Sequence, residues 1–168
     1  MDALSLAVRF APTEQEIFER FLFPRLAGDE EALRNSLVQF FELYDQDPTA
    51  AAFPPQPYFL ANNHYFFVNR APLTPASSQP YREIDNLASQ GRWKMVGKPK
   101  IVKRGNTIIL GKRNTLDFVT VEGKRTGWRQ YEYERILDAP IFQTVVVVHI
   151  FYQPGLNQNA DVNQLGDV

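Results

Sequence analysis

Residues 91–100 read GRWKMVGKPK and combine an aromatic side chain, alternating cations and two glycines. In an extended strand, successive side chains point to opposite faces. The side chains on one face would be Arg92, Lys94, Val96 and Lys98. On the other face, Trp93 and Met95 would anchor the strand in a core. The pattern therefore predicts a strand that can grip a polyanion with one face, and we expect the rest of the chain to support it.

The positive charge of this stretch continues along the following strands. Between residues 91 and 135 the chain holds twelve Lys and Arg against four acids, a local balance of +8. Residues 1–90 carry six bases and twelve acids, so the overall net charge of −1 hides a bipolar molecule. A surface of one sign steers an anionic partner whatever the distant charges do, and nucleic acid is the first candidate. The alternative is that these cations merely solvate the outer faces of strands.

The order of the predicted elements favours an α+β fold, with a twisted antiparallel sheet flanked by N-terminal helices. Thr13 and Glu16 form a predicted capping box at the start of a helix that Pro24 is expected to end. Asp29 is expected to cap a second helix that reaches about Val38, with Leu33 and Leu37 on one side. The predicted strands are 63–68, 92–96, 99–104, 107–111, 114–121, 128–135 and 144–152, with turns at Gly105-Asn106 and Glu122-Gly123.

The length of 168 residues suits one domain, which we place at residues 1–153, followed by a polar tail at residues 154–168. The chain has no cysteine, which excludes a disulfide framework and a thiolate metal site. No apolar run reaches the roughly 18 residues of a membrane span, and the N-terminus lacks the pattern of a secretory signal. We therefore expect a soluble intracellular domain with no membrane partner.

Enzyme chemistry needs a constellation of side chains that the sequence does not assemble. His64 and His149 lie in apolar strands without an evident set of further metal ligands. Residues 105–113 (GNTIILGKR) superficially resemble a P-loop, but the spacing and the final residue differ from the motif. Glu132 and Glu134 have strand spacing, and a solvated strand face is the favoured interpretation over an acid and base pair. We predict no enzyme activity, no cofactor, no metal and no small-molecule substrate.

Four aromatic side chains could instead stack on the bases of a single strand. We expect them to lie mostly in the core. They are Trp93, Trp128, Tyr131 and Tyr133.

Residues 93–100, WKMVGKPK, resemble the WKATGKDK signature of the plant NAC-domain transcription factors. Further stretches resemble other blocks of that family in the same order: LSLAVRFAPTEQEIFERFL, LVQFFELYDQDP, HYFFVNR, QPYR, ILGKRNTLDFV, GKRTGWRQYEYERI and VVVVHIFYQ. The resemblance covers residues 4–153. The chain departs from the signature at Met95-Val96, where the family has Ala-Thr, and at Pro99, where the family has Asp.

The resemblance implies a nuclear, sequence-specific domain that binds double-stranded DNA and inserts the WKMVGKPK edge strand into the major groove. Lys94 and Lys98 would lie near base edges or adjacent phosphates. The other cations would bind the phosphate backbone of the DNA, with Arg92 as an extra contact. The implied DNA-binding residues are Arg82, Arg92, Lys94, Lys98, Lys100, Lys112, Arg113, Lys124 and Arg125. The alternative is a diverged NAC-fold module for dimerisation and protein interaction that binds DNA weakly or not at all.

The resemblance also implies a two-fold dimer in which Arg9 and Glu16 exchange ion pairs between subunits. Such a symmetric interface uses the same patch twice. Apolar neighbours would carry most of the association, since exposed ion pairs contribute little. These neighbours are Leu4, Leu6 and Val8. We expect a homodimer, and heterodimers with other NAC proteins remain open, as does an intramolecular pair between Arg9 and Glu16.

Overall fold

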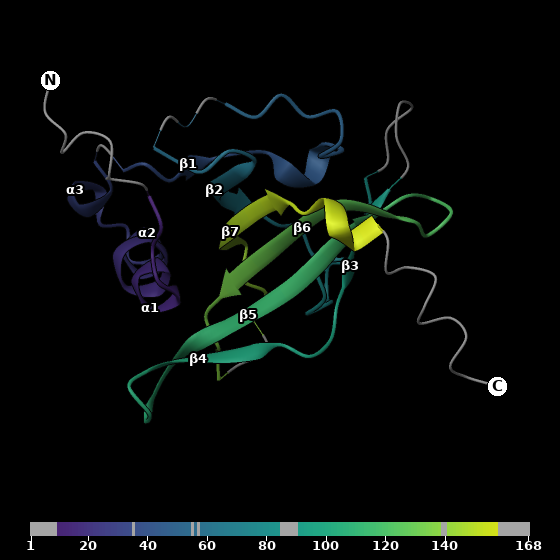
Figure 1. Ribbon diagram of the computed structural model, residues 1–168. Coiled ribbons are helices and arrows are strands. Elements are labelled where there is room, and N and C mark those ends of the chain that lie inside the picture. The colour runs from purple at the N-terminus through teal and green to yellow at the C-terminus, as the bar shows by residue number, and fades with distance from the viewer. Residues whose placement is uncertain are drawn as a thin grey trace, which may run out of the picture.

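The computed structural model describes residues 10–34, 36–54, 56, 58–84, 91–138 and 141–157. Within these ranges, the first part of the chain is helical and a seven-stranded sheet follows (Figure 1). The helices gather beside one part of the sheet, near β1 and β2 in the view of Figure 1. This arrangement confirms the predicted α+β class. None of the helices in the described ranges is long and apolar enough to cross a membrane.

The sheet has the order β1-β2-β7-β6-β5-β3, and β4 also pairs with β5. Its strands are β1 (Gln39–Phe40), β2 (Asn63–Asn69), β3 (Arg92–Met95), β4 (Lys100–Arg104), β5 (Ile108–Val119), β6 (Arg125–Glu134) and β7 (Val145–Tyr152). Every pairing is antiparallel, as predicted, except that β1 runs parallel to β2. β3 and β4 pair with successive stretches of the long β5, so both lie along the same edge of the sheet.

The first helix begins as the capping box predicts. The Glu16 N–H donates to Thr13 Oγ1 at 3.2 Å, and the Thr13 N–H donates to the Glu16 carboxylate at 3.4 Å. The helical run comprises α1 (Glu14–Glu16), a π-helical segment (Ile17–Leu22) and α2 (Phe23–Leu26).

The prediction that Pro24 ends this helix is wrong. The π-helical turn shifts the hydrogen bonding, and the Phe23 N–H donates to the carbonyl of Phe18. Pro24 falls in the first turn of α2, a position that tolerates proline, and the helical run continues to Leu26.

The second predicted helix is shorter than expected. Asp29 caps α3 (Glu30–Leu33) by accepting from the Ala32 N–H at 3.0 Å, but α3 ends at Leu33 rather than near Val38. Beyond it, the Val38 N–H donates to Ser36 Oγ at 3.2 Å, a local side-chain bond that competes with helix continuation. Leu33 is buried, whereas Leu37 is 41% exposed and lies beyond the end of α3, so the two do not lie on one side of a helix as predicted.

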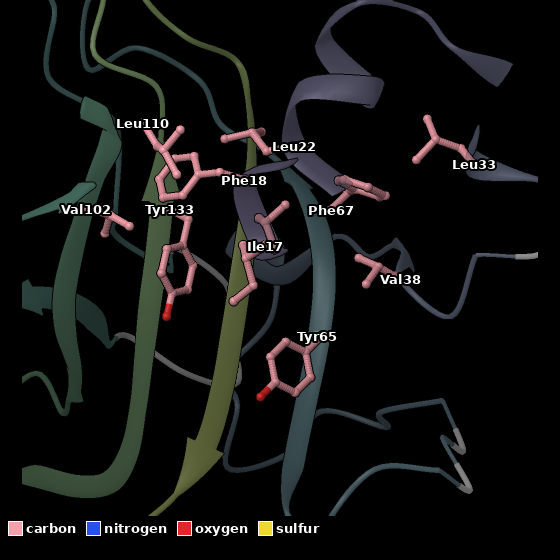
Figure 2. Close-up of a cluster of buried hydrophobic side chains, with 11 residues drawn as sticks. Ile17, Phe18, Leu22, Leu33, Val38, Tyr65, Phe67, Val102, Leu110 and Tyr133 are labelled. Carbon is pink, nitrogen blue, oxygen red and sulfur yellow. The ribbon is translucent and has the colours of Figure 1, made fainter. Parts of the chain in front are cut away.

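Two apolar clusters cover the two faces of the sheet. One joins the N-terminal helices to β2, β4, β5, β6 and β7, and Figure 2 shows Phe18 of the π-helical segment beside Tyr133 of β6, with ring centroids 5.9 Å apart. Its buried members are Ile17, Phe18, Leu22, Leu33, Val38, Tyr65, Phe67, Val102, Leu110, Tyr133 and Val147. The other cluster lies under the segments that follow β1 and β2. Its buried members are Leu43, Phe66, Val68, Ile84, Trp93, Leu116, Phe118, Val146, Val148 and Ile150.

The strand boundaries differ from the prediction where pairing partners decide them. Residues 108–119 form one strand instead of two, because Lys112 and Arg113 pair continuously with β6 on one side and β4 on the other. After β7, residues Pro154–Asn157 form a 3-10 helix whose Leu156 is buried, so packing onto the sheet extends past residue 153.

Candidate nucleic-acid interface

The WKMVGKPK stretch forms an edge of the sheet, but not as one strand. β3 ends at Met95 and β4 begins at Lys100, with Gly97 at φ +67° between them. The predicted alternation holds within β3: Lys94 is exposed, and Trp93 is only 2% exposed. The edge therefore presents β3, a corner and β4 in succession, with Lys98 at the corner.

Strand pairing brings four cations onto one face, because residues directly opposite each other in neighbouring strands share a face. Lys94 in β3 lies opposite Asp117 in β5, which lies opposite Arg129 in β6. Two residues further along β5, Val119 lies opposite Arg92 of β3 and opposite Arg125 of β6. We name this surface the basic face, and its cations are Arg92, Lys94, Arg125 and Arg129.

A single buried acid organises the basic face. Asp117 is 2% exposed and accepts two hydrogen bonds from Arg129, from Nε at 2.6 Å and Nη2 at 3.1 Å. Arg125 Nε lies 3.4 Å from the same carboxylate. The hydrogen bonds to Asp117 raise the pKa of Arg129 above its usual value. Asp117 thus fixes two guanidinium groups and neutralises part of their charge, a role that the local charge balance did not reveal.

Two further predicted cations flank the basic face. Lys98 lies in the corner after β3, and Lys124 lies in the turn between β5 and β6, where its N–H donates to Thr120 Oγ1 at 3.2 Å. This turn contains Gly123 at φ +83°, as the predicted Glu122-Gly123 turn requires. Both lysines are exposed, and Lys124 attracts Glu122 in the same turn. Their charges are available to a partner.

Lys100 and Arg113 share one face, but a helix acid engages both. Lys100 Nζ lies 2.6 Å from one carboxylate oxygen of Glu14 in α1, and Arg113 Nη1 lies 3.4 Å from the other. The Arg113 guanidinium also lies 4.2 Å from the centroid of the Tyr131 ring. These two cations tie the sheet to the helices as well as lying beside the candidate interface.

Lys112 and Arg82 lie on the opposite face of the sheet. Lys112 is adjacent to Arg113 in β5 and therefore points the other way, where its Nζ lies 2.8 Å from Glu134. Arg82 Nη2 lies 2.8 Å from the buried carboxylate of Glu132. Both side chains already have a counter-charge, and the structure does not bring them together with the basic face.

The carboxylate that holds Arg82 is the centre of a buried polar network. Glu132 is 0% exposed and accepts from Arg70 at 2.8 Å, from Asn114 at 3.1 Å and from the Tyr44 hydroxyl. Burial alone would raise the pKa of Glu132, but the nearby guanidinium groups of Arg70 and Arg82 outweigh it and lower the pKa to about 2. Glu132 therefore remains ionised at neutral pH and acts as a structural anion. The interpretation of Glu132 as part of a solvated strand face is wrong, because its carboxylate is buried with Arg70 and Arg82. Sequence reasoning identified neither Arg70 nor Tyr44 as its partners, because they lie 62 and 88 positions away.

The other aromatic and ionisable candidates are also accounted for by packing. Trp93 and Tyr133 are each 2% exposed, in agreement with the core interpretation. His149 stacks on the Tyr65 ring at 4.2 Å, and burial lowers its pKa to about 4. Within the described ranges, no group of three or more His, Asp or Glu side chains is arranged to hold a metal ion.

Most of the predicted dimer residues lie outside the described residues. These are Leu4, Leu6, Val8 and Arg9. Glu16 is described, and its carboxylate accepts from Thr13 and lies 3.4 Å from Arg20. Beside it is a groove of about 480 Å³ whose lining includes Phe10, Phe21 and Tyr58. The geometry places a half-exposed acid at the rim of an apolar groove.

Comparison with known proteins identifies the family. The family model described as "No apical meristem (NAM) protein" matches residues 5–135. NAC domain-containing protein 40 of Arabidopsis thaliana is 31% identical over 136 residues, which are 79% of this chain and 38% of that protein. NAC domain-containing protein 2 of Oryza sativa subsp. japonica is 34% identical over 135 residues, which are 78% of this chain and 39% of that protein. The chain spans well under half the length of these relatives. These matches confirm the resemblance seen in the signature: the chain belongs to the plant NAC-domain family.

Proposed function

We propose that this domain binds double-stranded DNA sequence-specifically, as the dimeric DNA-binding part of a nuclear transcription regulator. The edge formed by β3 and the corner after it enters the major groove. Lys94 and Lys98 reach base edges or adjacent phosphates. Three further cations bind the phosphate backbone of the DNA: Arg92, Lys124 and Arg125. Lys100 and Arg113 flank this surface, and their contacts to DNA compete with Glu14.

One observation carries the proposal. Two exposed cations of β3 lie on the same face as two arginines of β6, at an edge of the sheet, and the exposed Lys98 and Lys124 lie next to them. A two-stranded ribbon or a sheet edge fits the width of the major groove, and phosphate contacts position the protein while base contacts specify the sequence. Lys112 and Arg82 are not included in this surface, because carboxylates on the other face engage both.

Duplex binding at several salt concentrations tests the proposal. About five neutralised phosphates give a slope of log affinity against log salt near −4 to −5. Lys94→Ala and Lys98→Ala should each weaken binding about tenfold or more, since a good base contact contributes about 1–3 kcal/mol.

Lys103→Ala is the matched control. Lys103 is an exposed lysine of β4 that forms no ion pair with another described residue, so its loss removes the same charge from outside the signature. It should change affinity less than about threefold, as a peripheral phosphate contact. Equal losses from all three variants contradict the groove assignment. No duplex affinity tighter than about 10 μM at roughly 100 mM salt would support the alternative, a module for dimerisation and protein interaction.

A further inference from the structure

The outer side of β3 is partly covered by residues 82–84. The Trp93 N–H donates to the carbonyl of Arg82 at 2.9 Å, and the Ile84 N–H donates to the carbonyl of Gly91 at 2.8 Å. An isolated antiparallel bridge adds a further pairing between the two segments. The first half of β3 therefore forms backbone hydrogen bonds on both sides, with β5 on one side and with residues 82–84, the covering segment, on the other.

Two side chains anchor the covering segment to the body of the domain. Ile84 is 2% exposed and belongs to the same buried cluster as Trp93. Arg82 reaches Glu132 of β6, with Nη2 at 2.8 Å from Oε1. The backbone of Arg82 thus holds the edge strand, while its side chain holds a fully buried carboxylate near the middle of the sheet.

This arrangement opposes a role for Arg82 as a phosphate contact. To reach a phosphate, the guanidinium of Arg82 would have to move away from Glu132. Arg70 would then be the guanidinium that remains beside this carboxylate. Arg70 is also engaged by Glu134, with Nη2 at 2.7 Å, so Glu132 would keep a single guanidinium that it shares with a second carboxylate, although Lys112 also pairs with Glu134. An uncompensated buried charge costs far more than an exposed ion pair returns. The ion pair with Glu132 therefore prevails.

We propose that Arg82 is a positioning residue for the DNA-reading strand. Glu132 holds its guanidinium, and its carbonyl holds the N–H of Trp93, so that the adjacent Lys94 projects from a strand fixed on both sides. Arg82 promotes DNA binding through β3 and does not touch the duplex. This inference rests on the proposed DNA binding, because it assigns a role within that same site.

Amide hydrogen exchange in the free protein tests the structural half of the inference. In Arg82→Met, exchange at Trp93 should accelerate about tenfold or more relative to the amides of β6 and β7 in the same variant, because one anchor of the covering segment is lost. Arg70→Met is the matched control, since it also removes an arginine from Glu132, and the hydrogen bonds and ion pairs of Arg70 to described residues go to Glu132, Glu134, Gln143 and Thr144 and not to β3. It should lower protection generally without selective opening at Trp93. Unchanged protection in Arg82→Met, or the same selective opening in Arg70→Met, would overturn the inference.

A double-mutant cycle on duplex affinity tests the functional half. Arg82→Met alone should weaken binding about tenfold, whereas in a Glu132→Met background it should cost less than about threefold, because the partner through which Arg82 acts is already gone. A direct phosphate contact would cost the same factor in both backgrounds, as Lys124→Met should. Additive losses for Arg82 and Glu132 would therefore overturn the inference.

Two further outcomes remain interpretable. If Arg82→Met does not fold, the Arg82→Met/Glu132→Met double variant removes both members of that ion pair together, which a fold tolerates far better than the loss of one. Arg70 keeps Glu134 as its counter-charge. The Trp93 amide of this double variant should still exchange faster than that of Arg70→Met/Glu132→Met, and equal rates would contradict the inference. If the wild type binds no duplex, the proposed function fails, while Trp93 exchange still decides whether Arg82 holds β3.

Discussion

At the scale of single residues, Glu132 is a buried side chain whose charge contributes to the stability of the fold. It is fully buried beside Arg70 and Arg82, and these cations outweigh the effect of burial and lower its pKa from 4.5 to about 2. A carboxylate whose folded-state pKa lies below its unfolded-state pKa stabilises the fold fully above the unfolded value. That contribution is lost as the pH falls from 4.5 towards 2.

We predict that protonation of this group lowers the free energy of unfolding by about 3 kcal/mol between roughly pH 5 and pH 2. Glu132→Gln should lose about 3–5 kcal/mol at neutral pH, because it leaves buried guanidinium groups without their counter-charge, and its acid profile should be flatter. Urea denaturation across this pH range measures both effects. Glu14→Gln, at a partly exposed ion pair, is the control and should keep the wild-type acid profile. The same acid slope in Glu132→Gln as in the wild type would contradict the assignment.

Residue roles were predictable where they depend on immediate neighbours. Alternation along a strand predicted a buried Trp93 and an exposed Lys94, and the structure agrees. The ion pair of Arg82 with Glu132 was not predictable in the same way, because the two residues lie 50 positions apart and no local pattern links them. Asp117 likewise counted only as one acid among many cations, although it fixes Arg125 and Arg129.

At the scale of elements, the candidate reading edge consists of two short strands joined by a corner. Gly97 occupies this corner at φ +67°, with open space around the position of a Cβ. The left-handed backbone conformation there costs a residue with a side chain about 1–2 kcal/mol, irrespective of space. The corner lets β3 and β4 pair with successive parts of β5 and places Lys98 between them.

Gly97→Ala should therefore lower the free energy of unfolding by about 1–2 kcal/mol, and Gly97→Asn should cost less, because Asn tolerates this conformation. Chemical denaturation measures both changes. Gly155→Ala is the control, since that position also has open space but no positive φ. Equal effects of Gly97→Ala and Gly155→Ala would show that the corner does not depend on the glycine conformation.

Element boundaries followed from the sequence where local chemistry decides them. The capping box at Thr13 and the Glu122-Gly123 turn were both found in place. The end of the first helix was not predictable from Pro24, because the π-helical turn before it changes which N–H groups need partners. The continuity of β5 depends on its pairing with both β4 and β6, and the sequence of β5 alone does not reveal these partners.

At the scale of the whole molecule, the fold uses part of its charge asymmetry internally. Acids of the N-terminal helices meet bases of the sheet: Glu14 engages Lys100 and Arg113, and Glu19 pairs with Arg104. The excess of cations in residues 91–135 is therefore reduced on the side of the helices and retained at the basic face. The sequence predicted the excess of cations. It could not predict which of these cations pair with acids of the helices and which remain exposed, because that depends on which strands the helices cover.

The same scale includes assembly, where Glu16 is the described residue of the proposed reciprocal pair. One of its carboxylate oxygens accepts from Thr13 Oγ1 at 3.1 Å, and the other lies 3.4 Å from Arg20 Nη1. The side chain is still 38% exposed, so an arginine from a second subunit can join the less engaged oxygen. An apolar groove lies beside Glu16. In the predicted dimer, Leu4, Leu6 and Val8 carry most of the association, since exposed ion pairs contribute only about 0–1 kcal/mol each.

A charge exchange between subunits tests this assembly. Arg9→Glu and Glu16→Arg should each weaken the homodimer about tenfold, because each replaces two attractions with two repulsions across the two-fold axis. Mixing the two variants should restore a heterodimer, since one pair is then native and the other is reversed. Glu16→Gln is the control, because Gln still serves the capping box and removes the charge alone, so it should weaken the dimer less than Glu16→Arg. Sedimentation measures each case. A monomeric wild type at tens of micromolar, or no recovery in the mixture, would favour the intramolecular pair, in which Arg9 and Glu16 meet within one chain and exchanging their charges between chains gains nothing.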